Sequence, residues 1–223
     1  MIARWPWAAG GGPSSEAALV FDRARAHRLL IVPPLFEEMN RTRRLLVETM
    51  RRLDAAGIDS MLPDLPGCNE SLEPFAAQSL TRWRAAMAHA AQHFDVTHAL
   101  AVRGGALILP AALPGWLYEP AKGASLLRQM LRARIVAARE QGIAEDSAGL
   151  IEQGRKHGLE LAGYGFGAAL IAELEEAVPP ATGLREIRQG ELEGGALWLR
   201  SEPDDNPQQA EALAQIIARE IAG

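Results

Sequence analysis

Three short apolar runs, separated by amphipathic segments, constrain the fold of this chain more than any other feature. The runs lie in 29–34 (LLIVPP), 58–67 (IDSMLPDLPG) and 97–102 (THALAV), and amphipathic helices are expected over 41–56 and 77–93 between them. The first run is apolar and β-branched at successive positions, which is typical of a parallel strand buried on both faces. Strands and helices that alternate at this spacing form a mostly parallel sheet with helices on both faces. The sequence therefore predicts an α/β fold.

The size of the chain is that of one domain. Its 223 residues are 48% hydrophobic, enough to bury a substantial core. We predict a single domain over 1–223, in which 1–16, rich in Trp, Pro, Gly and Ser, is a loosely held lead-in. The alternation lapses over 115–158, a helical and strand-poor stretch that we interpret as an inserted cap. The alternation then resumes and ends with a strand over 196–200 and a helix over 207–222.

Charge and cysteine content exclude several classes of protein. A net charge of -5 argues against a general nucleic-acid binder, which needs a basic surface. The single cysteine, Cys68, cannot form an internal disulfide and suits a reducing compartment. The N-terminal residues lack the apolar stretch of a signal peptide, and no run reaches the ~18 apolar residues of a membrane helix. We expect a cytoplasmic protein without a membrane span.

The third apolar run leads directly into AVRGG, residues 101–105. A strand, a tight turn and a helix in this order carry a nucleophilic serine in many hydrolases, with small residues on both sides of the tip. Ala101 and Gly105 meet that requirement, and Gly104 relaxes the turn, but the tip is Arg103. A guanidinium stays protonated and is no nucleophile. It can instead bind an anion at the start of a helix, or belong to an ordinary junction where it reaches solvent or pairs with a carboxylate.

The loop PPLFEEMNRTRR, residues 33–44, follows the first strand at its carboxyl end, where loops line the ligand crevice of open α/β sheets. Glu37 and Glu38 are both candidates for a bidentate pair with Arg103. They are also explained as acids in the solvated first turn of a helix. The predicted contacts of a small acyl or anionic ligand are Phe36, Glu37, Glu38, Asn40, Arg103 and Gly104.

Other reactive side chains form no clear site. Cys68 and Ser71 lie in a turn-rich loop, where such residues more often organise turns or stay idle. His89 and His93 have the i,i+4 spacing of metal ligands, but no third ligand accompanies them, so we expect no metal and no cofactor. His157 is the one histidine placed near a sheet-edge site, and none follows it. An unconventional site of Ser71 or Cys68 with His157 stays open as an alternative.

The order of these motifs resembles a known family. PPLFEEMNRTRR, PDLPGCNES, a tryptophan-bearing helix, AVRGGALIL and LYEPAKGASLLRQMLRARI are similar to the second type of exosortase A-associated hydrolase, found in bacterial exopolysaccharide and PEP-CTERM protein-sorting loci. The family's loop has the form PPFxEEMNxxRR and its elbow roughly GxRxG. The resemblance covers about 29–136 well. It implies an α/β-hydrolase fold, an arginine at the elbow as a family trait, and an ester- or thioester-type substrate.

This chain departs from the pattern of a serine hydrolase. It has Ala101 in place of the first elbow glycine, and it lacks a late histidine for a Ser–Asp–His order. Loss of nucleophile and base together removes the acyl-enzyme route. Three functions follow as hypotheses: a protein that binds an acyl or anionic ligand without serine catalysis, a hydrolase with an unconventional site, and a non-catalytic scaffold for a protein partner of an export or glycan locus. The scaffold would use the arginines of the cap, which are Arg128, Arg132, Arg134 and Arg139.

Overall fold

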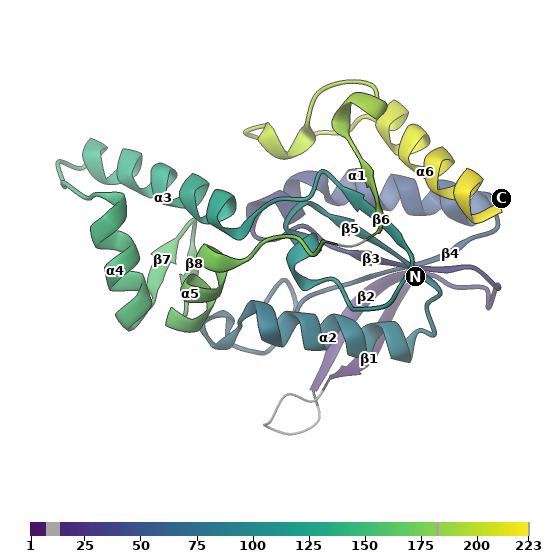
Figure 1. The fold of residues 1–223 in the computed structure, drawn as a ribbon, viewed down its shortest axis with the longest axis horizontal. Coiled ribbons are helices and arrows are strands. Elements are labelled where there is room, and N and C mark those ends of the chain that lie inside the picture. Colours follow the sequence, from purple (N-terminus) through teal and green to yellow (C-terminus); the bar gives the residue numbers. More distant parts are fainter. Residues whose placement is uncertain (8–13, 182, 223) are drawn as a thin grey trace.

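A mixed sheet forms the centre of the protein (Figure 1). The computed structural model describes residues 1–7, 14–181 and 183–222, and seven strands within these ranges form the sheet in the order β1-β2-β4-β3-β5-β6-β9. Their bounds are β1 Ile2–Trp7, β2 Ser14–Phe21, β3 Arg28–Val32, β4 Asp59–Pro63, β5 His98–Val102, β6 Gly115–Tyr118 and β9 Arg185–Ile187. Strands β4, β3, β5, β6 and β9 run parallel to one another. Strands β1 and β2 form an antiparallel hairpin at one edge, where β2 pairs antiparallel with β4.

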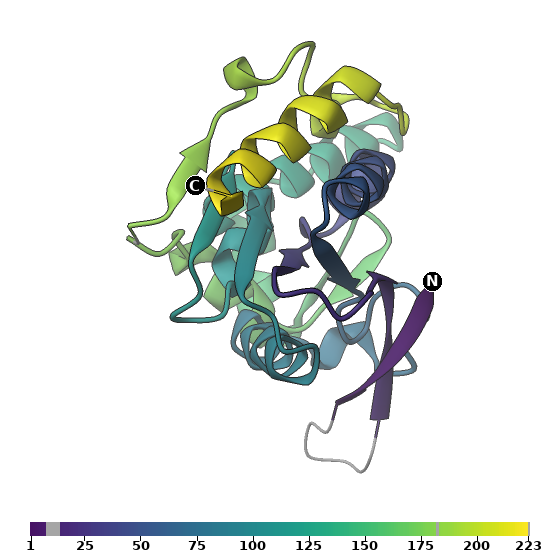
Figure 2. The same cartoon turned by 90° about the vertical axis from the view of Figure 1, so that its right-hand side faces the viewer.

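Helices cover both faces of the sheet, as predicted (Figures 1 and 2). They are α1 (Glu37–Ala55) and α6 (Pro207–Ala222) on one face and α2 (Leu80–His93) on the other. Side chains of β3 alternate between the two layers: Leu29 and Ile31 pack with α1 and α6, whereas Leu30 and Val32 pack in the layer of α2. A strand apolar at every position is thus buried on both sides, which confirms the α/β class.

A cap follows β6 and extends away from the sheet (Figure 1). It consists of α3 (Gly123–Glu140), α4 (Ser147–His157), the hairpin β7 (Leu159–Leu161) and β8 (Tyr164–Phe166), and α5 (Ala168–Glu176). The predicted cap of 115–158 is therefore misplaced at both ends. Its first four residues form β6, whose Trp116 and Leu117 are buried beside β5, because so short an apolar run does not distinguish strand from helix.

The loose lead-in predicted for 1–16 is wrong for the described residues. Ile2–Trp7 and the following strand form a regular hairpin, in which Trp5 and Trp7 are 0% and 6% exposed. Both rings contact His89 of α2, with ring centres 6.2 and 6.1 Å apart. Burial of two tryptophans stabilises this edge of the sheet. The rest of the predicted lead-in, 8–13, lies outside the described residues.

Three other boundaries differ from the sequence prediction. Residues 196–200 contain a short 3₁₀ helix, η4 (Leu197–Leu199), and not the last strand. The turn after β5 continues as a 3₁₀ helix, η2 (Arg103–Ile108), and not as a long helix. Helix α1 begins at Glu37, four residues earlier than expected. The closing helix α6 agrees with its prediction over 207–222.

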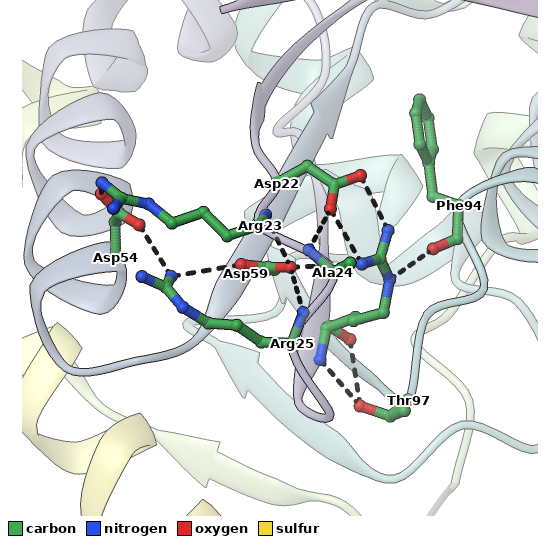
Figure 3. A network of polar contacts seen from close by, with 9 residues as sticks. Asp22, Arg23, Ala24, Arg25, Asp54, Asp59, Phe94 and Thr97 are labelled. Atoms are coloured by element: carbon green, nitrogen blue, oxygen red, sulfur yellow. Dashed lines mark hydrogen bonds and ion pairs between the residues drawn. The ribbon is translucent and has the colours of Figure 1, made fainter.

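A buried carboxylate joins the amino ends of the parallel strands (Figure 3). Asp59, at the start of β4, is 0% exposed and accepts hydrogen bonds from the backbone N–H groups of Arg23 and Arg25, at 3.0 and 2.9 Å. The guanidinium groups of Arg25 and Arg28 also contact it, at 3.1 and 3.2 Å. Arg28 also binds Asp22 and lowers the pKa of that carboxyl to about 2. Asp22 and Asp59 are thus paired with arginines inside this network. We therefore expect a ligand site at the opposite, carboxyl ends of the strands.

Candidate functional site

The turn after β5 is sharp and strained, as predicted. Arg103 has a φ of 54°, in the left-handed region that a non-glycine residue rarely adopts. A Cβ at Gly105 would lie 2.6 Å from the carbonyl oxygens of both Val32 and Pro33. Only glycine therefore lets the turn approach the end of β3 this closely. The Arg103 side chain projects from this turn at the carboxyl edge of the sheet.

The guanidinium of Arg103 forms a bidentate ion pair with Glu38. Nε and Nη2 donate to the two carboxylate oxygens, each at 3.1 Å. Glu38 lies in the first turn of α1, and its side chain is only 5% exposed. Burial raises the pKa of Glu38, and the hydrogen bonds from Arg103 partly offset this effect. Of the two acids considered from the sequence, Glu38 is thus the partner.

Two further groups hold the same guanidinium. Nη1 donates to the carbonyl oxygen of Glu119, at 2.9 Å, and Cζ lies 4.4 Å from the ring centre of Trp198. Glu119 follows β6, and Trp198 lies in the 3₁₀ helix before α6. Neither contact is predictable from the sequence, because the pattern at 196–200 favours a strand and nothing marks Glu119 apart from other acids. The tip of the elbow is therefore filled by a cation with four contacts inside the chain.

A small pocket of about 140 Å³ lies beside the ion pair, between the loop after β3 and helix α3. Phe36, Glu37 and Glu38 line it. They are three of the six predicted ligand contacts, and their contact with a ligand stays a prediction. Arg103 and Gly104 are not among its lining residues, and Asn40 is exposed on α1. The other lining residues include Leu35, Arg41, Leu126, Gln129, Met130 and Ala133. Three of the six predicted contacts thus lie together with residues of the cap helix α3, which were not among the predicted contacts.

An aromatic cluster joins the pocket loop to the cap. Phe36 has a φ of 60° and packs its ring 5.0 Å from Phe166 and 6.1 Å from Trp83. Tyr164 and Phe75 complete the cluster, with their rings 5.0 Å apart. Phe166 and Tyr164 belong to the cap hairpin β7–β8. Phe36 also lines the pocket, so the cap hairpin packs on a residue of the site, and α3 of the cap forms one wall of the pocket.

The alternative nucleophiles have structural roles. Burial raises the pKa of the Cys68 thiol to about 12, so the reactive thiolate does not form at neutral pH. The Ser71 hydroxyl accepts a hydrogen bond from the backbone N–H of Gly67, at 2.8 Å, and donates to Glu16, at 2.9 Å. His157 is exposed at the end of α4. The structure does not bring this histidine into contact with either nucleophile.

Among the described residues, no group of three or more His, Cys, Asp or Glu side chains could hold a metal ion. His98 begins β5, at the end of the strand opposite Arg103, and stacks on Trp116. No helix in the described part of the chain is long and apolar enough to cross a membrane.

A larger cavity of about 460 Å³ lies next to the elbow, lined by Ala106 and Leu107 of η2 but not by Arg103, Gly104 or Gly105. It is lined mainly by apolar side chains, those of 106–107 and 109–113 and of Val178, Pro180 and Leu184. The one charged residue in its lining is Arg84, whose Nη2 donates to the carbonyl oxygen of Leu107 at 2.6 Å. Size alone favours this cavity, but the ion pair, the strained loop and the cap meet at the smaller pocket. We therefore assign the candidate site to the smaller pocket.

The strand order, the sharp turn after β5 and the cap after β6 define an α/β-hydrolase fold, and solved structures share it. A proposed hydrolase from Agrobacterium vitis S4 superimposes with a TM-score of 0.61 at 17% identity, over 97% of this chain and 98% of that one. A thermophilic esterase from Thermogutta terrifontis gives 0.55 at 13% identity, over 99% and 98% of the two chains. Est1E from Butyrivibrio proteoclasticus gives 0.55 at 12% identity, over 94% and 95%. Likeness at such low identity shows the fold alone.

Comparison of sequences adds nothing to this assignment. No family model matches the chain, and no curated protein matches it. The chemistry of the protein must therefore be inferred from its own side chains.

Proposed function

We propose that this chain is an α/β-hydrolase-fold protein that binds a small acyl or anionic ligand beneath its cap and does not hydrolyse it by a serine mechanism. One observation carries the proposal: the elbow tip, where a nucleophile stands in hydrolases of this fold, holds Arg103 in a bidentate pair with Glu38. A permanently charged guanidinium cannot attack a carbonyl carbon. The chain also has no histidine after His157 to act as a base.

The pocket has the composition expected for a short acyl group. Leu35, Phe36 and Met130 supply apolar walls, and Gln129 of α3 and Arg41 of α1 supply donors. The carboxylates of Glu37 and Glu38 also line the pocket and are paired with Arg41 and Arg103. Arg41 donates through Nη2 to Glu37, at 2.7 Å. A guanidinium has five N–H donors, so Arg41 retains capacity for a carboxylate or carbonyl oxygen. A volume of about 140 Å³ equals the space of roughly five water molecules, at ~30 Å³ each, so the pocket holds a short acyl group and the remainder of a larger ligand lies outside it.

The motifs support a finer proposal about context. We propose that the chain is of the exosortase A-associated type, and that its ligand belongs to exopolysaccharide assembly or PEP-CTERM protein sorting. The support is the order of the loop motif at 33–44, the arginine elbow at 101–105 and the cap motif at 117–135. In this view Arg103 is a trait of the type, and the cytoplasm is the place of action.

A matched pair of cap variants tests the ligand site. Ala133 lines the pocket from α3, and Ala137 lies one turn further along the same helix, outside this pocket; both are exposed. Ala133→Trp places an indole over the pocket, whereas Ala137→Trp adds the same bulk elsewhere. We expect calorimetric titration with butyrate and with the thioester S-butyryl-N-acetylcysteamine to give saturable binding in wild type and Ala137→Trp. Binding should be at least about tenfold weaker in Ala133→Trp.

Thiol release from the same thioester distinguishes binding from hydrolysis. We expect the release rate with protein to equal the rate in buffer. Release that rises in proportion to protein and falls in Ala133→Trp would show that the site is a hydrolase. Equal affinities of the two tryptophan variants would remove this pocket from the function.

A further inference from the structure

Three arginines on one cap helix have no partner among the described residues. Arg128, Arg132 and Arg139 are exposed on α3, and none of them has a hydrogen bond or an ion pair with any residue that the structure describes. Arg134, on the same helix, forms a bidentate pair with Glu145. Most other arginines of the chain are also paired with a carboxylate. An unpaired set on a single helix therefore needs its own explanation.

Two of the three line a groove. Arg128 and Arg132 lie one turn apart at a groove of about 380 Å³ between α3 and α4. Leu127, Leu131 and Ile151 form apolar parts of its wall. Like charges at i,i+4 destabilise a helix, and neither arginine forms an ion pair with an acid in the described part of the chain. The arrangement joins an apolar groove to two cations that lack counter-ions.

The acids near the groove are already engaged. Glu175 lines it, but both of its carboxylate oxygens accept hydrogen bonds from Arg155, at 2.7 and 2.8 Å. Asp146 precedes the groove residue Ser147 and accepts from the backbone N–H groups of Ala148 and Gly149, each at 3.0 Å. The Ser147 hydroxyl is a further donor at the groove. The two free guanidinium groups are therefore matched by a ligand with two negative charges.

We propose that this groove binds a phosphate monoester with a short alkyl tail. A phosphate monoester carries about -1.5 to -2 charges at neutral pH, and the planar donors of arginine match its oxygens. The phosphate would lie between Arg128 and Arg132, with the tail along Leu127, Leu131 and Ile151. These residues differ from those of the pocket beside Glu38, so the two sites are independent. A free organophosphate and a phospholipid headgroup share this chemistry.

Calorimetric titration with hexyl phosphate tests the site, and the third arginine provides the control. Arg128→Gln and Arg132→Gln each remove one charge at the groove, whereas Arg139→Gln removes the same charge from the same helix away from it. We expect an affinity about tenfold weaker in each of the first two variants and unchanged in the third. Methyl phosphate should bind more weakly than hexyl phosphate, by up to about fourfold for each methylene that the groove buries. All three side chains are exposed, so thermal unfolding should show that each variant is folded.

The possible outcomes separate the proposal from its alternatives. Flotation with vesicles containing phosphatidate, measured in the same variants, identifies the source of the phosphate. Recruitment that Arg128→Gln and Arg132→Gln abolish, together with binding of hexyl phosphate, supports a lipid headgroup. Binding of hexyl phosphate without recruitment supports a free organophosphate. The proposal is overturned if Arg139→Gln weakens binding as much as the other two, if hexyl phosphate does not bind at millimolar concentration, or if vesicles bind and hexyl phosphate does not.

Discussion

The ion pair at the elbow predicts a large and pH-dependent loss of stability in Arg103→Met. Methionine keeps a long side chain and the same β-carbon, so the strain at a φ of 54° is unchanged. The variant leaves the carboxylate of Glu38 buried, with its side chain 5% exposed and no guanidinium bonded to it. Removing one partner of a buried pair costs about 3–5 kcal/mol, because the remaining charge is uncompensated. We expect the lower part of this range, since Arg41 also lowers the pKa of Glu38 from a distance.

The converse variant should be milder. In Glu38→Gln the cation that remains is more exposed, at 15%, and keeps its contacts with the Glu119 carbonyl and the Trp198 ring. We expect a loss of about 1–2 kcal/mol, the range for a lost hydrogen bond to a charged group. The double variant should be more stable than Arg103→Met alone, although it carries one more substitution, because it contains no buried charge.

The sign of the pH dependence follows from the pKa of Glu38. Burial raises this pKa above its usual value in wild type, and loss of Arg103 raises it further. A raised carboxyl pKa destabilises the folded state while the group is ionised, and this cost disappears as the pH falls through the folded pKa toward the unfolded one. The deficit of Arg103→Met should therefore shrink from pH 8 to pH 5. Glu38→Gln should show no such recovery.

Urea unfolding followed by tryptophan fluorescence at pH 8 and pH 5 measures these differences. The wild type, both single variants and the double variant complete a thermodynamic cycle for the pair. Three results would each refute the reasoning. They are a deficit for Arg103→Met below about 1 kcal/mol at pH 8, a deficit equal at both pH values, and a double variant less stable than Arg103→Met.

Three further predictions concern single residues. Gly105→Ala should lower the free energy of unfolding by about 3 kcal/mol, because the new Cβ would lie against backbone oxygens. In Gly104→Ala the new Cβ would contact only side chains, so the free energy of unfolding should fall by about 1 kcal/mol. Thermal unfolding of the two variants compares these losses. Cys68 should resist iodoacetamide at pH 8 in the folded protein and react after unfolding in urea, since its pKa is about 12; equal rates would contradict its burial. Asp22→Asn should be less stable than wild type above about pH 4, because it lacks the pair with Arg28. The difference should shrink as the pH falls from the unfolded pKa, ~3.9, through the folded one, about 2, and should vanish only below the folded pKa; urea midpoints across this range test it.

The features that could be predicted from the sequence are those encoded in long periodic segments. The buried run of β3 and the amphipathic pattern of α1 specify two layers around a parallel sheet. The approach of Arg103 to the loop at 33–44 also follows from sequence, because β3 and β5 are parallel and both segments leave at carboxyl ends. Choosing Glu38 over Glu37 requires the helix to start at 37, which a helix expected over 41–56 does not provide.

The features that could not be predicted depend on short elements. Strand β9 has three residues, too few to show an alternation, and the last strand was therefore assigned to 196–200. That segment turns instead and buries Trp198, so the aromatic contact of Arg103 could not be foreseen. The edge hairpin of β1 and β2 could not be predicted, because residues 1–16 are rich in Gly and Pro, which is typical of loops. Its tryptophans, Trp5 and Trp7, nevertheless belong to the core.

The sharp turn at residue 103 is explained by packing against the end of β3. Gly105 is required because the turn lies against Val32 and Pro33 at the end of β3, a contact within the sheet framework. The strain at Arg103 accompanies that approach whatever side chain stands at the tip. An α/β-hydrolase fold can thus keep its elbow for stability while the tip residue changes. The chemistry of such a chain depends on the tip residue, and here the tip is a guanidinium bonded to a buried carboxylate, which cannot act as a nucleophile.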